Sequence, residues 1–224
     1  MNKKCVLASV VCALSLINGM AQAAPGGAEG RAGSWRSAMQ GSPSLPAAKK
    51  VLDAKPQDAI ANNDYGWALR QHGDNAQAET FLRKAVQLDP KMAAAHSNLS
   101  VVLVDAGKLD EAKTEAAQAV ALSPDNAIFK VTLGNALSKS GDRKGAIEQY
   151  QAAVKLKPDY ENALYNLGRV LKEDGQVADA KGVLAEALKY DPNDERVMSL
   201  LDDVTGDTTA VVPPTVPGKA KKAK

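Results

Sequence analysis

Two histidines are the side chains of this chain best suited to acid–base or metal chemistry, because imidazole changes charge near neutral pH and binds metal ions readily. His72 and His96 are far apart in sequence, and neither belongs to a His-Glu-x-x-His motif. His72 precedes Gly73, as expected for a side chain that meets the last carbonyls of a helix. His96 is expected on a packing face. Both positions favour structural roles, and we expect no metal site.

The other reactive groups do not form a catalytic set either. The chain has no Gly-rich phosphate loop, and its two cysteines, Cys5 and Cys12, both lie near the N-terminus. Aspartate and glutamate occur beside lysine at spacings typical of solvated helix faces. The sequence therefore predicts a protein that is not an enzyme and needs no cofactor.

The elements that carry these side chains are predicted to be helices. Aromatic residues make up 4% of the sequence, against 45% apolar residues in total, so the core must consist mainly of alanine, leucine and valine. Such a core suits closely packed helices better than β-sheets, which favour branched and aromatic side chains.

Residues 1–23 are organised like an export signal. Two lysines precede a largely apolar run that ends in Ala-Gln-Ala, where small residues flank a spacer as signal peptidase requires. We expect cleavage near Ala23 and export to the periplasm of a bacterium or beyond it. Two alternatives stay open. One is an uncleaved membrane anchor, although the run is shorter than the ~20 residues that span a bilayer, and the other is a lipoprotein modified at Cys12.

Charge is distributed unevenly along the rest of the chain. Residues 43–206 contain 20 basic and 24 acidic side chains, whereas the sequence ends in the basic segment KAKKAK. A mildly acidic body without a basic folded face argues against nucleic-acid binding. The basic end suits weak contact with anionic components of an envelope.

A 34-residue period runs through the chain. Glycine suits a helix C-terminus, alanine lets two helices approach closely, and proline ends a second helix, so a column of each predicts a stack of two-helix units. Four such columns keep the period: Pro56, Pro90, Pro124, Pro158 and Pro192; Gly73, Gly107, Gly141 and Gly175; Ala78, Ala112, Ala146 and Ala180; and Ala85, Ala119, Ala153 and Ala187.

This pattern resembles the tetratricopeptide repeat family. Four units fit, at 59–92, 93–126, 127–160 and 161–194. The resemblance implies an all-α fold, a right-handed α-solenoid of helix-turn-helix repeats in which each unit buries its apolar face on the next. Position 8 of the units reads Gly, Ser, Gly and Gly, and position 24 reads Leu, Ala, Tyr and Leu. The second unit departs most from the family pattern and is expected to pack most loosely.

Flanking segments complete the predicted organisation. Residues 43–58 are expected to be a degenerate half-repeat with one helix, and residues 195–206 a capping helix on the last unit. Residues 24–42 are rich in glycine, and residues 207–224 are rich in proline and lysine, which is typical of flexible tails. Exposed terminal helices would also allow self-association of the array.

The resemblance implies a binding groove on the concave side of the stack. Positions 2, 5, 9, 12 and 13 of each unit point away from the packing side of its first helix, and in the family this side lines the groove. Asparagine at position 6 contacts the peptide backbone in some related arrays. The partner-binding residues predicted from these positions are Asn63, Trp67, Arg70, Asn98, Asn135, Lys139, Asn162, Tyr165, Asn166, Arg169, Lys172 and Arg196.

Some family members bind the C-terminal carboxylate of a peptide with asparagines and basic residues at fixed positions. Asn135, Asn166 and Arg196 occupy three of these positions, but two others hold apolar residues. Because amide and guanidinium donors suit carboxylate acceptors, we hypothesise that an extended peptide of acidic or carboxylate character binds near Asn135, Asn166 and Arg169. The alternative is that these side chains only keep an exposed helix face soluble.

The sequence thus predicts a scaffold or adaptor of the bacterial envelope that binds a protein or peptide partner in its groove. A loose resemblance to the exported repeat protein of tight-adherence pilus systems implies a role in assembling a pilus or secretion complex. The alternative function is a surface tether that acts through the lysine-rich segment 207–224 on anionic lipid or polymer.

Overall fold

The computed structural model describes residues 43–206, so the expected export signal and both predicted tails lie outside the described residues. Between residues 43 and 206 the chain forms ten α-helices and no β-strand, which confirms the prediction of an all-α fold. None of these helices combines the length and the hydrophobicity that a membrane span requires. The helices are α2 (Leu45–Ala54), α3 (Ala59–Gln71), α4 (Asn75–Leu88), α5 (Ala93–Asp105), α6 (Leu109–Leu122), α7 (Ala127–Lys139), α8 (Arg143–Leu156), α9 (Glu161–Glu173), α10 (Val177–Tyr190) and α11 (Glu195–Thr205).

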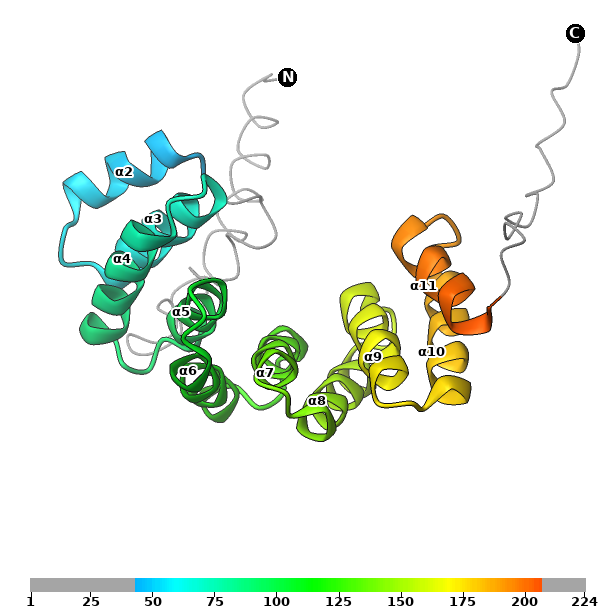
Figure 1. Cartoon of the computed structure of the whole chain (residues 1–224). Coiled ribbons are helices and arrows are strands. Elements are labelled where there is room, and N and C mark those ends of the chain that lie inside the picture. The colour runs from blue at the N-terminus through cyan, green and yellow to red at the C-terminus, as the bar shows by residue number, and fades with distance from the viewer. Residues whose placement is uncertain (1–42, 207–224) are drawn as a thin grey trace, which may run out of the picture.

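The helices pack in consecutive pairs that stack into a curved solenoid (Figure 1). Helices α3 with α4, α5 with α6, α7 with α8 and α9 with α10 form four two-helix units, and each second helix also packs on the first helix of the next unit. The first helices line the inner side of the curve and the second helices its outer side. Helix α2 packs on α3 as a preceding second helix would, and α11 packs on α9 and α10.

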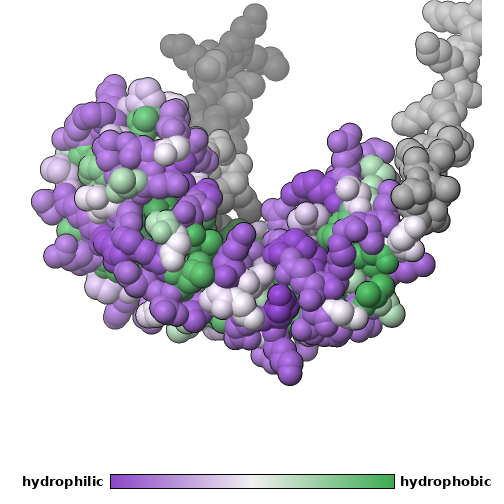
Figure 2. Space-filling model, in the orientation of Figure 1, coloured by the Kyte–Doolittle hydropathy of each residue, from purple (hydrophilic) through white to green (hydrophobic). Residues whose placement is uncertain are grey.

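The flank of the solenoid that faces the viewer in Figure 2 is mostly hydrophilic, with hydrophobic side chains in separate patches. Between residues 43 and 206, the large apolar side chains that are exposed belong to four different helices: Val51 of α2, Ile128 of α7, Leu156 of α8, and Val177 and Tyr190 of α10. Isolated apolar side chains of this kind are normal on a protein surface.

Glycines in the left-handed region follow the first helix of every unit. Gly73, Gly107, Gly141 and Gly175 have φ values of 85°, 75°, 88° and 82°. A side chain with a Cβ atom is strained in this conformation, so glycine lets the chain reverse into the second helix at little cost. This local requirement explains the glycine column of the sequence.

The residues at positions 8 and 24 of a unit are matched in size. In the third unit, a Cβ atom added to Gly134 would lie 2.6 Å from the Tyr150 ring, so the large ring requires a glycine opposite it. The second unit reverses the sizes, because Ser100 stands at position 8 and Ala116 at position 24. Both are fully buried, and Ser100 Oγ donates a hydrogen bond of 2.8 Å to the Ala112 carbonyl. The expected loose packing of the second unit is therefore absent at this pair.

The buried apolar residues form two main clusters that meet at α7. The N-terminal cluster runs from Ala48 to Ala136 and the C-terminal cluster from Val131 to Val204. Val131 and Ala136 both lie on α7, so the first helix of the third unit joins the two halves of the solenoid.

Candidate partner-binding groove

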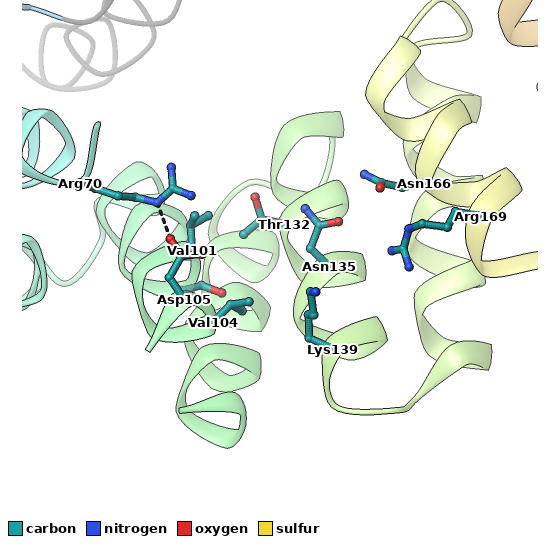
Figure 3. A pocket seen from close by; sticks show the side chains of 10 residues that line it. Arg70, Val101, Val104, Asp105, Thr132, Asn135, Lys139, Asn166 and Arg169 are labelled. Atoms are coloured by element: carbon teal, nitrogen blue, oxygen red, sulfur yellow. Dashed lines mark hydrogen bonds and ion pairs between the residues drawn. The ribbon is translucent and has the colours of Figure 1, made fainter. Parts of the chain in front are cut away.

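The first helices of the four units enclose a groove of about 440 Å³ at the middle of the inner side (Figure 3). Helices α3 and α5 form its N-terminal wall, α7 forms its floor and α9 forms its C-terminal wall. Five of the twelve predicted partner-binding residues line it. The complete lining is Arg70, Ser100, Val101, Val104, Asp105, Thr132, Asn135, Lys139, Asn166 and Arg169.

An ion pair joins the two helices of the N-terminal wall. Arg70 Nε donates to Asp105 at 2.8 Å, and the Arg70 guanidinium also lies over the Trp67 ring, 4.9 Å from its centroid. Trp67 and Arg70 therefore contact each other rather than standing apart as separate anchors. Val101 and Val104 supply the apolar part of this wall.

The floor holds an asparagine that a tyrosine orients from below. Tyr150 of α8 is fully buried and donates its hydroxyl hydrogen to Asn135 Oδ1 at 2.7 Å. Burial raises the pKa of Tyr150, which keeps the phenol protonated as a donor. Because the oxygen of Asn135 is occupied by this bond, its amide nitrogen is the group left to donate to a ligand. Sequence reasoning missed Tyr150, whose signal was the aromatic residue at position 24 opposite Gly134.

The floor and the C-terminal wall together hold one engaged side chain, Arg169, and two side chains that have no internal partner in the described part of the chain. Arg169 donates to Glu173 at 2.5 Å and to Ser138 Oγ at 3.4 Å. Within residues 43–206, by contrast, the side chains of Lys139 and Asn166 make no hydrogen bond or ion pair. These two polar side chains are therefore open to a ligand.

The asparagines nearer the N-terminus are already paired. Asn98 Nδ2 donates to Asn63 Oδ1 at 2.9 Å, and Asn63, which is 3% exposed, donates in turn to Asp64 at 3.1 Å. In the next unit, Ser97 Oγ donates to Thr132 Oγ1 at 3.1 Å. The predicted residues Asn63 and Asn98 lie outside the groove lining and hold neighbouring units together.

The remaining predicted residues tie the last unit to its cap. Arg196 of α11 binds Asp194 at 2.8 Å, lies 5.3 Å from the centroid of the Tyr165 ring and reaches Asn162 Oδ1 at 3.5 Å. The Arg196 guanidinium holds the pKa of the Asp194 carboxyl below its ordinary value. Lys172 forms an ion pair with Asp203 of the same cap. None of these four predicted residues lines the groove.

Both histidines occupy the structural positions expected of them. His72 Nδ1 lies 3.0 Å from the Ala68 carbonyl oxygen at the end of α3. His96 is 6% exposed, with Nδ1 2.6 Å from Glu115 Oε2 and Nε2 3.0 Å from the Pro90 carbonyl oxygen. The carboxylate of Glu115 is the main cause of the raised pKa of His96.

One acidic cluster among residues 43–206 brings three carboxylates together. One oxygen each of Glu161, Asp191 and Asp194 lies within 4.8 Å of the others. Asp194, however, already accepts hydrogen bonds from Arg196 and from two backbone N–H groups at the start of α11. Its geometry is that of a helix cap.

The chain belongs to the tetratricopeptide repeat family. Models of this repeat match residues 44–93, 69–130, 134–175 and 162–194. Together they span nearly all of the described solenoid, which confirms the family predicted from the 34-residue period. No curated protein sequence matches the chain.

Solved structures of other repeat proteins share the fold. The chain superposes on MamA from Desulfovibrio magneticus RS-1 with a TM-score of 0.60 and 24% identity, covering 72% of this chain and 93% of that one. For TTC0263 of Thermus thermophilus the TM-score is 0.64 at 20% identity, with coverage of 72% and 88%. For YrrB, described as a TPR protein with an unusual peptide-binding site, the values are 0.57 and 23%, with coverage of 74% and 95%.

Proposed function

We propose that this protein is a non-enzymatic adaptor that binds an extended segment of a partner protein in its groove. The observation that carries the proposal is the convergence of polar donors from α7 and α9 on one space, opposite the apolar side chains of α5. The donors are Asn135, Lys139, Asn166 and Arg169. A peptide that bears a carboxylate would supply acceptors for these donors, and its apolar side chains would find Val101 and Val104.

The fold supports this proposal independently of the donors. Stacked helix pairs form an extended concave surface, which is the usual binding surface of solenoid proteins. YrrB, with the same fold, is described as having a peptide-binding site. The four family models that match the chain are all models of this repeat, which supports a role in binding rather than catalysis.

The proposed location is the bacterial envelope, after export and cleavage near Ala23. The support is the signal-like organisation of residues 1–23. A role in assembling a pilus or secretion complex rests on the sequence resemblance alone. The second candidate function, a surface tether, is favoured by the four lysines of the KAKKAK segment.

Crosslinking in the envelope fraction, followed by mass spectrometry, distinguishes the groove from the basic segment. Crosslinks from Lys139 to one recurring protein are expected if the groove holds the partner. Crosslinks confined to Lys219, Lys221, Lys222 and Lys224 would instead favour the tether.

Peptide binding tests the groove directly. The probe is the fluorescein-labelled octapeptide Gly-Ser-Val-Gly-Asp-Ser-Gly-Gly, titrated by fluorescence anisotropy up to about 1 mM, the weak end of specific binding. We expect Arg169→Glu to weaken binding by about tenfold or more, because it replaces a donor by a repelling charge. Asn166→Ala should weaken binding severalfold. The control is Lys181→Glu on the exposed surface of α10, and unchanged affinity in both groove variants would overturn the proposal.

A further inference from the structure

Polar side chains on the first helices of neighbouring units pair at a fixed spacing of 35 residues. Three such pairs join the first three units: Asn63 with Asn98 at 2.9 Å, Ser97 with Thr132 at 3.1 Å, and Arg70 with Asp105 at 2.8 Å. The first two pairs join position 5 of one unit to position 6 of the next, and the third joins position 12 to position 13. Two parallel series of contacts therefore run along the inner side.

Both series are interrupted at the groove. In the series that pairs Arg70 with Asp105, the next members are Val104 and Lys139, and valine offers no acceptor to the ammonium. In the series that pairs Ser97 with Thr132, the next members are Val131 and Asn166, and valine again leaves the amide unpaired. The two unpaired side chains, Lys139 and Asn166, line the same groove.

The unpaired state of these side chains is a property of the sequence and not of their repeat positions. Asn98 occupies the same position 6 as Asn166 and is hydrogen-bonded, and Asp105 occupies the same position 13 as Lys139 and is ion-paired. In the free protein, water must satisfy Lys139 and Asn166. A ligand with matching acceptors would replace that water with charge-assisted hydrogen bonds.

Lys139 differs from the other two cations of the groove because no carboxylate of the described residues neutralises it. Arg70 is neutralised by Asp105 and Arg169 by Glu173. Lys139 is exposed and has no such partner within residues 43–206. It therefore provides the uncompensated positive charge of the groove, beside the amide of Asn135 on the same helix (Figure 3).

We infer that Lys139 and Asn166, the side chains left unpaired where the two series are interrupted, form a recognition subsite. It binds one carboxylate and one peptide group of an extended acidic peptide. Lys139 binds the carboxylate, Asn166 hydrogen-bonds the peptide backbone, and Val101 with Val104 contacts an apolar side chain on the opposite wall. Lys139 is thus the residue that sets the preference for an acidic peptide. The inference rests on the proposed function and narrows it, because it excludes the paired N-terminal residues Asn63 and Asn98 from recognition.

Supplying the missing internal partner tests the subsite. Val104→Glu places a carboxylate 35 residues before Lys139, in the relation that Arg70 has to Asp105. We expect it to capture Lys139 and to weaken binding of the fluorescein-labelled octapeptide by about tenfold, as direct removal of the ammonium in Lys139→Met should also do. The matched control is Val104→Gln, which has nearly the same size without the charge. An equal loss of affinity in Val104→Gln would overturn capture of Lys139 as the mechanism.

The source of the carboxylate is resolved with four forms of the octapeptide: aspartate or asparagine at its fifth residue, each with a free or an amidated C-terminus. Loss of affinity on changing aspartate to asparagine assigns the subsite to an acidic side chain, whereas loss on amidation assigns it to the C-terminal carboxylate. Affinity that is the same for all four forms, or absent for all four, would overturn the inference.

The outcomes separate the subsite from the general function. If Arg169→Glu abolishes binding while Lys139→Met and Val104→Glu leave the affinity unchanged, the groove binds peptides but the proposed subsite is wrong. If none of the three variants changes the affinity, the groove is not the binding site and both proposals fail. The expected result is a loss in all three, with thermal melting curves used to confirm that each variant is folded.

Discussion

The two halves of the inner surface use the same repeat positions for different purposes. On α3 and α5, the polar side chains satisfy one another, as in the hydrogen bond between Asn63 and Asn98 and the ion pair between Arg70 and Asp105. On α7 and α9, Lys139 and Asn166 have no internal partner within the described residues. The comparison teaches that, among the polar residues facing a solenoid groove, those that the neighbouring unit does not already satisfy are the strongest binding candidates.

The difference between the halves arises from a few small substitutions. Valine at Val104 and Val131 removes the partners that the pattern of the preceding units would supply. Apolar side chains cost little stability at these two positions, because Val131 is buried and Val104 packs against the N-terminal cluster. Their consequence is that two donors stay available to a ligand.

The largest expected effect on stability comes from giving the third unit, which begins the C-terminal half, the pair of small residues found in the second unit. Tyr150→Ala removes a fully buried ring from below the groove and is expected to lower the free energy of unfolding by about 3–5 kcal/mol. Adding Gly134→Ser should restore part of this loss, because Ser100 and Ala116 form such a pair in the second unit. Urea unfolding measures both variants. A double variant no more stable than Tyr150→Ala alone would contradict the matching of these positions.

A smaller effect on stability is expected from the pH dependence of His96, which lies in the N-terminal half. His96 lies between Glu115 and the Pro90 carbonyl, and both acceptors favour the charged imidazolium, so folding raises the pKa of His96 above 6.5. The stabilisation is therefore fully present below about pH 6.5 and is lost as the pH rises through the pKa of the folded state. We expect the stability difference between the wild type and His96→Gln to be about 1 kcal/mol in mild acid and to shrink in alkali. A difference that grows with rising pH would contradict this account.

The smallest expected effect concerns the ion pair of the N-terminal wall. Arg70 and Asp105 are each about one third exposed, so solvent screens their attraction. A double-mutant cycle with Arg70→Ala and Asp105→Ala should give a coupling free energy of about 0.2–1 kcal/mol, and peptide affinity should change by less than twofold. A tenfold loss of affinity in Arg70→Ala would extend the recognition surface to this wall and remove the contrast between the halves.

The fold was predictable from the sequence because its signals are local and repeated. Glycines such as Gly107, at a positive φ of 75°, and prolines such as Pro124 act on their own stretch of backbone and need no information from distant residues. Because they recur every 34 residues, the helix pairs and the repeat family could be predicted without any knowledge of the packing.

The site was predictable only in part. Helical geometry indicated that Arg70, Asn135, Lys139 and Arg169 share a face, and the family resemblance added Asn166. The groove contains all five residues. The sequence did not reveal which were already engaged, because the decisive contacts join residues 35 apart or reach the floor from Tyr150 on an outer helix. The valines that interrupt the pairing become informative only once that spacing is known from the structure.

The most direct test of the contrast compares one substitution at the same repeat position in two units. Asn98→Ala leaves the buried oxygen of Asn63 without its donor, so we expect a loss of about 1–2 kcal/mol in the free energy of unfolding and unchanged peptide affinity. Asn166→Ala removes no internal hydrogen bond, so we expect a severalfold loss of peptide affinity and a change in stability below about 0.5 kcal/mol. Urea unfolding and anisotropy titration of both variants decide the question. Equal effects of the two substitutions on both quantities would contradict the account.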